Sequence, residues 1–186
     1  MTTAFLDEVS QEQFEEGLKG GDNRYVQVSK IEGEKRLRFI GAAKTGLEGW
    51  IVGEGDEKDK PIRFEKRPEE LPEDLRTDDK GKPQLKHFLA GVVWDYDSQS
   101  LMILSMTQKT LREQLFKFIR DEDYGDPQGY DIKISREGEG LNTKYGLLAS
   151  PPKPVSKEIK EAWDTEGVKI NLQALFDNED PFADCA

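Results

Sequence analysis

Apolar and polar residues alternate along much of the chain, which is the pattern of strands with one face buried. The strands expected from this alternation cover residues 25–30, 36–41, 47–52, 86–96, 100–106, 130–135 and 144–149. Residues 54–82 differ, because 19 of these 29 positions are charged. We expect them to form a solvated insertion in which only residues 62–64 can pair as a strand.

A helical spacing occurs in strong form once, after Thr107, where apolar residues recur at i, i+4, i+7 and i+8. These residues are Leu111, Leu115, Phe118 and Ile119. Weaker patterns predict helices over 10–19 and 156–163 and a last turn over 171–176. The order is therefore several strands, one isolated helix and two more strands, with peripheral helices at both ends.

This order predicts a mainly β protein. An OB-fold-like, five-stranded antiparallel barrel is the most economical arrangement, because it places one helix before its fourth strand. A β-sandwich is the alternative, but it would leave the isolated helix without a structural role. We expect four parts: an N-terminal helical segment over 1–23, the barrel over 24–153 with a charged insertion at 54–85, peripheral helices over 154–175, and an acidic tail over 176–186.

Composition and charge narrow the classes of function. The 186 residues include 38 acidic and 27 basic side chains, a formal net charge of −11. Residues 1–20 and 171–186 contribute −4 each, so the middle of the chain carries only −3 and can present a basic surface. One Cys and one His exclude a disulfide framework and a Cys/His zinc cluster, so we expect no metal and no cofactor.

Targeting signals and catalytic groups are not evident in the sequence. No apolar run reaches the ~18–20 residues of a membrane span, and no signal-peptide pattern opens the chain, so we expect a cytoplasmic protein without a membrane partner. His87 lies inside a predicted strand, and Asp95 and Asp97 lie in a hairpin turn, where carboxylates cap backbone groups. We therefore expect a protein without enzymatic activity.

Basic and aromatic residues are interleaved on the predicted strands, which is the pairing that single-stranded nucleic acid requires. Cations follow the phosphates, and aromatic faces stack on unpaired bases at about 1–3 kcal/mol each. The candidate groove residues are Arg36, Arg38, Lys44, Trp50, Lys86, Trp94, Tyr96, Lys133, Arg136 and Lys144.

The acidic C-terminal tail also contains apolar side chains, which a purely solvated terminus would not need. Its candidate anchors and charges are Phe176, Asp177, Glu179, Asp180, Pro181 and Phe182. A tail of this kind can occupy the protein's own basic groove when DNA is absent, and can dock on partner proteins when DNA displaces it.

Several motifs within residues 86–160 belong together. They are Trp94-Asp95-Tyr96-Asp97, Thr107-Gln108-Lys109-Thr110, Tyr124-Gly125-Asp126-Pro127, Gly129-Tyr130-Asp131-Ile132, Arg136-Glu137-Gly138-Glu139-Gly140-Leu141 and Ser150-Pro151-Pro152-Lys153-Pro154. As a set they resemble phage-encoded single-stranded DNA-binding proteins with an OB-fold. The resemblance implies a protein that binds and protects single-stranded DNA, without strong sequence preference, during phage-type replication, recombination or repair. Residues 177–182 are similar to the acidic tip through which bacterial single-stranded DNA-binding proteins contact replication and recombination proteins.

Two other classes of function stay open. An acidic mimic of DNA would inhibit a nucleic-acid enzyme, but it should spread carboxylates over its body, whereas the net negative charge gathers here at the two ends. A scaffold protein would bind only other proteins, through its tail and the 54–82 insertion. The sequence leaves the oligomeric state open, a homo-oligomer included.

Overall fold

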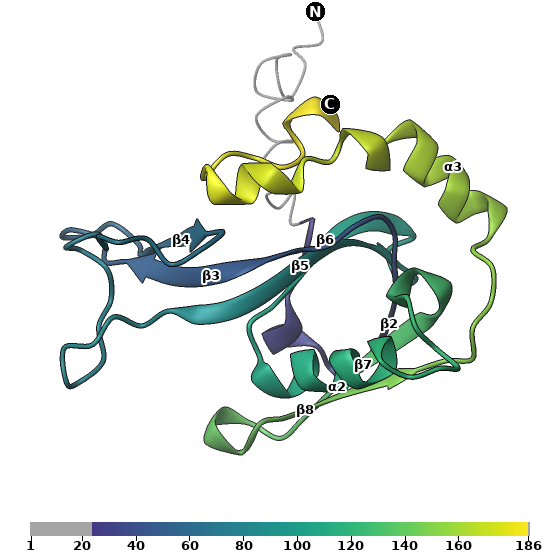
Figure 1. Ribbon diagram of the computed structural model, residues 1–186, viewed down its shortest axis with the longest axis horizontal. Coiled ribbons are helices and arrows are strands. Elements are labelled where there is room, and N and C mark those ends of the chain that lie inside the picture. The colour runs from purple at the N-terminus through teal and green to yellow at the C-terminus, as the bar shows by residue number, and fades with distance from the viewer. Residues whose placement is uncertain (1–23, 186) are drawn as a thin grey trace, which may run out of the picture.

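The computed structural model describes residues 24–185, which form one strongly curved sheet with helical segments against both of its faces (Figure 1). The strands are β1 (Tyr25–Val26), β2 (Gly33–Phe39), β3 (Lys44–Ile51), β4 (Lys60–Phe64), β5 (Lys86–Asp95), β6 (Ser100–Met106), β7 (Asp131–Glu137) and β8 (Lys144–Ala149). The α-helices are α2 (Lys109–Ile119) and α3 (Lys157–Thr165). The 3-10 helices are η1 (Val28–Lys30), η2 (Pro127–Gly129), η3 (Gly140–Asn142), η4 (Gly167–Lys169), η5 (Leu172–Phe176) and η6 (Ala183–Cys185). The helix expected over 10–19 lies outside the described residues.

The strands pair in the order β1-β6-β5-β2-β7-β8, and β3 and β4 extend the sheet as a two-stranded arm. Strand β5 joins the two parts, because its first half pairs with β3 and its last residues pair with β2. The mainly β class is confirmed. The expected five-stranded antiparallel barrel is not observed over residues 24–185, because β1 pairs in parallel with β6 and the other end strand, β8, pairs only with β7.

Side chains on β5 alternate between two apolar cores. Val93 points to the core that contains Leu104, Leu111 and Ile132, and we call this side the inner face. Phe88, Ala90, Val92 and Trp94 point to the opposite side, the outer face, and pack there with Leu101 and Ile103. Because both faces of β5 are buried, the strand is apolar almost throughout its length.

The C-terminal segment, residues 157–185, lies on the outer face of β5 and β6 (Figure 1). Its apolar side chains Ile159, Leu172, Leu175 and Phe182 are buried in the outer core. Ser156 begins this segment by capping α3, since its hydroxyl accepts a hydrogen bond from the Ile159 N–H. The sheet face under this segment is therefore covered by the protein's own chain.

The link between β2 and β3 brings the sheet against the C-terminal segment. Gly41 has a φ of +77°, and a Cβ at this position would lie 2.5 Å from the Trp163 ring of α3. Glycine is required here for both reasons, the backbone conformation and the close approach.

In the charged insertion, β4 pairs with β3, as expected from residues 62–64, and the side chain of Leu75 is buried.

Candidate nucleic-acid interface

Strand register places all the candidate groove residues except Arg136 on the outer face. Arg38 lies opposite Trp94 on β5 and opposite Asp131 on β7, and Arg36 lies opposite Lys133. Lys44, Trp50 and Lys86 share this face by alternation along β3 and β5. Arg136 has the opposite parity to Lys133 on β7, so it points to the inner side.

Two of the candidates are inside the protein and cannot touch a bound strand. Trp94 is 4% exposed, because it packs in the outer core. Arg38 is 1% exposed, and its guanidinium donates to the Gln128 carbonyl (3.0 Å) and to the Lys153 carbonyl (2.7 Å). These contacts make Arg38 a structural residue that holds the linker before α3, and both side chains leave the candidate set.

Three further candidates lie on β3 and on the part of β5 that pairs with it. Lys44 is exposed, but its Nζ donates to Gln173 Oε1 of η5 at 3.0 Å. Lys86, the first residue of β5, is exposed as well, and Trp50 of β3 is 41% exposed. These three residues are therefore on other strands than the candidates on β2, β7 and β8.

The remaining basic candidates form a cluster on the uncovered part of the outer face. We define the cation cluster as Arg36, Lys133, Lys144 and Lys153. The side chains of Arg36, Lys133 and Lys153 are 40%, 41% and 48% exposed. Beside Lys133 on β8 lies Leu148, which is 63% exposed, so nothing in residues 24–185 covers this part of the sheet.

A buried carboxylate, Asp131, organises this cluster. Its Oδ1 accepts hydrogen bonds from the Tyr96 hydroxyl (2.7 Å) and from Arg38 Nη1 (3.2 Å). Its Oδ2 accepts from Arg36 Nε at 2.9 Å and lies 3.1 Å from Lys153 Nζ. Three cations therefore share one carboxylate, and the group keeps a surplus of positive charge.

The protonation states in this group are firmly set at neutral pH. Burial alone would raise the pKa of Asp131, but hydrogen bonds from Arg36, Tyr96, Lys153 and Arg38 lower it to about 2. Burial, followed by the hydrogen bond to Asp131, raises the pKa of Tyr96 to about 12. Asp131 is consequently ionised and Tyr96 protonated, so the surplus of positive charge around Asp131 is fixed at neutral pH, whereas Lys133 of the same cluster lies 3.3 Å from Glu34 Oε1.

Arg36 lies over the Tyr96 ring and is partly exposed to solvent. Its guanidinium carbon lies 4.3 Å from the centroid of the Tyr96 ring, and Asp131 accepts a hydrogen bond from its Nε. A guanidinium held over an aromatic ring can pair with a phosphate, and guanidinium groups can also stack on bases. This arrangement combines both requirements for a single strand in one side chain.

Sequence reasoning missed Asp131 and Lys153 as parts of this site. A signal for Asp131 was present, because a carboxylate between Tyr130 and Ile132 in a buried strand must have partners. Nothing in the sequence indicates that Lys153, beyond β8, returns to the same carboxylate.

The candidate tail residues divide into buried anchors and exposed charges. The Phe176 ring lies 5.8 Å from the Phe88 ring, and the buried Phe182 ring lies 4.0 Å from the guanidinium carbon of Arg24. Pro181 is buried too. The other candidates, Asp177, Glu179 and Asp180, are exposed, and none of them forms an ion pair within residues 24–185.

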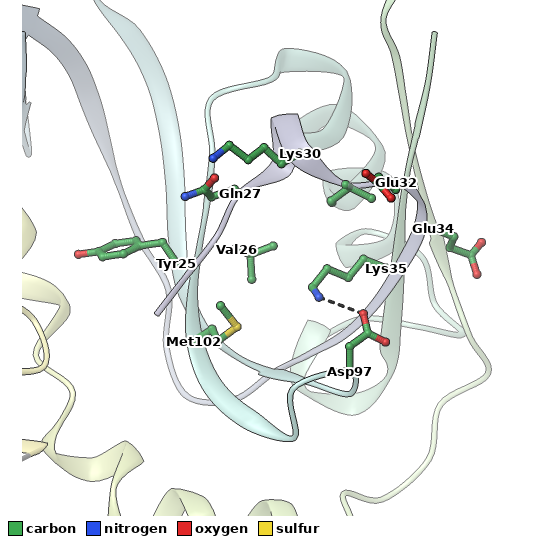
Figure 2. A pocket seen from close by; sticks show the side chains of 10 residues that line it. Tyr25, Val26, Gln27, Lys30, Glu32, Glu34, Lys35, Asp97 and Met102 are labelled. Carbon is green, nitrogen blue, oxygen red and sulfur yellow. Dashed lines mark hydrogen bonds and ion pairs between the residues drawn. The ribbon is translucent and has the colours of Figure 1, made fainter. Parts of the chain in front are cut away.

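A cavity of about 470 Å³ lies near β1 and the start of β2 (Figure 2). Its lining includes Lys30 and Lys35 but also the carboxylates Glu32, Glu34 and Asp97. Figure 2 shows Lys35 bound to Asp97, at a distance of 3.0 Å, so one of the two cations is already neutralised. This lining does not suit a polyanion, and the cation cluster remains the better candidate.

No family model, curated protein or solved structure matches this chain. Within residues 24–185, neither α-helix has the length and apolar composition needed to cross a bilayer. In the same part of the chain, no three His, Cys, Asp or Glu side chains come together as the ligands of a metal ion would.

Proposed function

We propose that this protein binds single-stranded DNA through the cation cluster and protects it without catalysing a reaction. The observation that carries the proposal is the sharing of Asp131 by three cations, with the Arg36 guanidinium over the Tyr96 ring in an uncovered sheet face. Phosphates would bind Arg36, Lys133, Lys144 and Lys153, and bases would stack on the Arg36–Tyr96 pair. Phosphates and base faces are common to all nucleotides, so little sequence preference is expected.

The order of the elements supports an OB-fold-like assignment for the sheet. Strands β1 to β6 precede the helix α2, β7 and β8 follow it, and α3 comes after β8. OB-folds bind oligonucleotides on the face of their central strands. The cation cluster and the covered part under the C-terminal segment are two halves of one such face in this protein.

The C-terminal segment supports a regulatory role beside the proposed strand site. It lies on the half of the outer face that carries Phe88 and Trp94, and it presents the unpaired carboxylates Asp177, Glu179 and Asp180. We propose that these charges oppose the approach of DNA at low salt. Once displaced, the segment can dock on replication or recombination proteins, in keeping with the resemblance of residues 177–182 to the acidic tip of bacterial single-stranded DNA-binding proteins.

The test is a titration of labelled oligo-dT with the full-length protein, followed by fluorescence anisotropy over a salt series. Four phosphate contacts predict a slope of log K against log salt of about −3. The double variant Lys133→Ala/Lys144→Ala should bind about tenfold more weakly at low salt, with a slope reduced by about 1.4. Neither side chain is buried, so the fold should be retained.

The matched control is Lys80→Ala/Lys82→Ala, which removes two exposed cations from the insertion. It should change the affinity less than about twofold, because long-range charge effects are screened over about 10 Å at 0.1 M salt. Equal losses in the two double variants would contradict the site. A wild-type protein that binds no oligo-dT but inhibits a nuclease would contradict the function and favour a DNA mimic.

A further inference from the structure

A groove runs along α2 on the inner side of the sheet, opposite the proposed DNA site. A cavity of about 510 Å³ lies between α2 and strands β3 and β5, and a smaller one of about 150 Å³ follows it. Both are lined by Leu89, Leu115 and Ile119, so they form one continuous groove. In Figure 1, α2 lies on the side of β5 away from the C-terminal segment.

Large apolar side chains are exposed along this groove. Phe116 is 53% exposed and Ile119 is 38% exposed. The inner core does not need them, since α2 fills that core with Leu111 and Leu115, which are fully or nearly fully buried. Clustered exposed apolar residues on a soluble protein mark an interaction surface more often than isolated ones do.

Charge changes sign from one end of the groove to the other. Lys109, Arg112 and Glu113 line the larger cavity, where Lys109 Nζ lies 3.5 Å from Glu113 Oε1, and the Arg120 guanidinium carbon lies 5.1 Å from the centroid of the Phe116 ring. Arg112 forms no ion pair with any residue from 24 to 185, and its buried Nε has no hydrogen-bond partner there. At the other end, Asp126 lines the smaller cavity.

We propose that this groove binds an acidic peptide segment of a partner protein. A carboxylate of the peptide would pair with Arg112, a second would compete with Glu113 for Lys109, and apolar side chains would pack on Phe116 and enter the smaller cavity beside Ile119. Arg112 supplies the strongest argument, because a bound carboxylate gives this cation the ion-pair partner that residues 24–185 do not provide.

A nucleic acid fits this groove less well than a peptide. A strand along its whole length would bring phosphates to Asp126 and to the acidic residues 121–123 that follow α2. Phe116 is the one exposed Phe, Tyr or Trp among the lining residues of the two cavities, whereas a single strand stacks successive bases on several aromatic platforms. The protein's own C-terminal segment is occupied elsewhere, since Phe182 is buried on the outer face. The occupant that we propose is a segment of a different protein.

The test measures binding of a short fluorescein-labelled peptide, in which a run of Asp precedes two Phe residues, to the full-length protein. We expect saturable binding that weakens about tenfold or more in Arg112→Glu, because the variant replaces the attractive charge with a repulsive one. Phe116→Ser should weaken binding through lost apolar contact. The control Lys117→Glu makes the same charge change at an exposed residue of α2 that does not line either cavity, and should alter binding less than about threefold.

Two controls use the peptide itself. Replacing its Asp residues with Lys, or its Phe residues with Ser, should abolish binding at the same protein concentration. The proposal is overturned if the acidic peptide does not bind, if Lys117→Glu weakens binding as much as Arg112→Glu, or if oligo-dT displaces the peptide. Circular dichroism of each variant confirms that a loss of binding is not a loss of fold.

Discussion

The two halves of the outer face belong to one sheet but lie on different strands, and they are stabilised in different ways. On β5 and β6, the face carries Phe88, Val92, Trp94 and Ile103 and is covered by the C-terminal segment. On β2, β7 and β8, the face carries cations arranged around one buried carboxylate, and nothing in residues 24–185 covers it. The border runs between β5 and β2, where Trp94 pairs with Arg38.

This difference separates two tasks on one surface. The covered half gains its stability from apolar burial, which depends little on salt or pH. The uncovered half keeps its cations in place through hydrogen bonds to Asp131, which leave exposed parts of Arg36 and Lys153 available. An anion that binds to the exposed cations would therefore affect the uncovered half of the face and leave the packing of the covered half unchanged.

The largest effect should follow from Asp131→Asn, which removes the charge that the uncovered half is built on. Arg38 would remain buried without its ionic partner, and losing one partner of a buried ion pair costs about 3–5 kcal/mol. Urea denaturation measures this as a fall in the free energy of unfolding. The control Asp97→Asn, at a side chain that is 69% exposed, should cost less than about 1 kcal/mol. Equal losses in the two variants would show that Asp131 does not organise the face.

Phe182→Ala should produce the next largest effect and tests the covered half. Phe182 is 8% exposed and packs in the outer core with Tyr25 and Arg24, so its truncation should cost about 2–4 kcal/mol. Phe116→Ala is the matched control, because Phe116 is 53% exposed, and it should cost less than about 1 kcal/mol. Similar unfolding midpoints for Phe182→Ala and the wild type would mean that the segment is not bound to the sheet.

Acid should weaken the uncovered half through Asp131. Its pKa is lowered to about 2 from 3.8, so the ionised carboxylate contributes stability that is complete above about pH 5 and is lost as the pH falls toward 2. The loss attributable to Asp131 is about 2 kcal/mol. Unfolding free energies at pH 5 and at about pH 2 should differ by this much more in the wild type than in Asp131→Asn. Parallel pH curves would remove Asp131 as the cause.

The smallest effect concerns the charges that the covering segment presents. The triple variant Asp177→Asn/Glu179→Gln/Asp180→Asn keeps Phe176 and Phe182 and should raise oligo-dT affinity severalfold at low salt, by about 1 kcal/mol. Deletion of residues 176–186 should also raise affinity, but it removes the Phe182 anchor as well. The control neutralises three exposed carboxylates of the insertion, Glu69, Glu70 and Glu73. An equal gain in that control would show that only net charge matters.

The periodicity of the sequence was sufficient for most elements of the fold. The strand predicted over 144–149 has the observed bounds of β8, and α2 begins two residues after Thr107. The sequence pattern could not show that the sheet does not close into a barrel. It predicted one strand over 25–30, whereas β1 has only two residues, Tyr25–Val26, and η1 follows at Val28–Lys30. Local alternation gives the pairing faces of strands but not which edges meet.

The candidate site shows the same limit more sharply. Arg36 and Arg38 are equivalent in the sequence pattern, yet one is 40% exposed along its side chain and the other is 1% exposed. The difference arises from the Gln128 and Lys153 carbonyls, which close over Arg38 from distant parts of the chain. Long-range contacts of this kind leave no periodic signal in the sequence. The sequence therefore predicted which residues share the outer face, but not that Arg38 and Trp94 are buried.

The contacts of Lys153 determine where the C-terminal segment can turn. Its backbone N–H bonds the Gly129 carbonyl and its own carbonyl accepts from Arg38, so the chain is fixed to the sheet up to this residue. A segment that leaves the outer face must pivot after Lys153, at residues 154–156, and stays attached beside the cation cluster. Its return is then an intramolecular step whose rate and equilibrium do not depend on protein concentration. Under the proposed displacement by DNA, the covered state would re-form within one molecule once the strand is released.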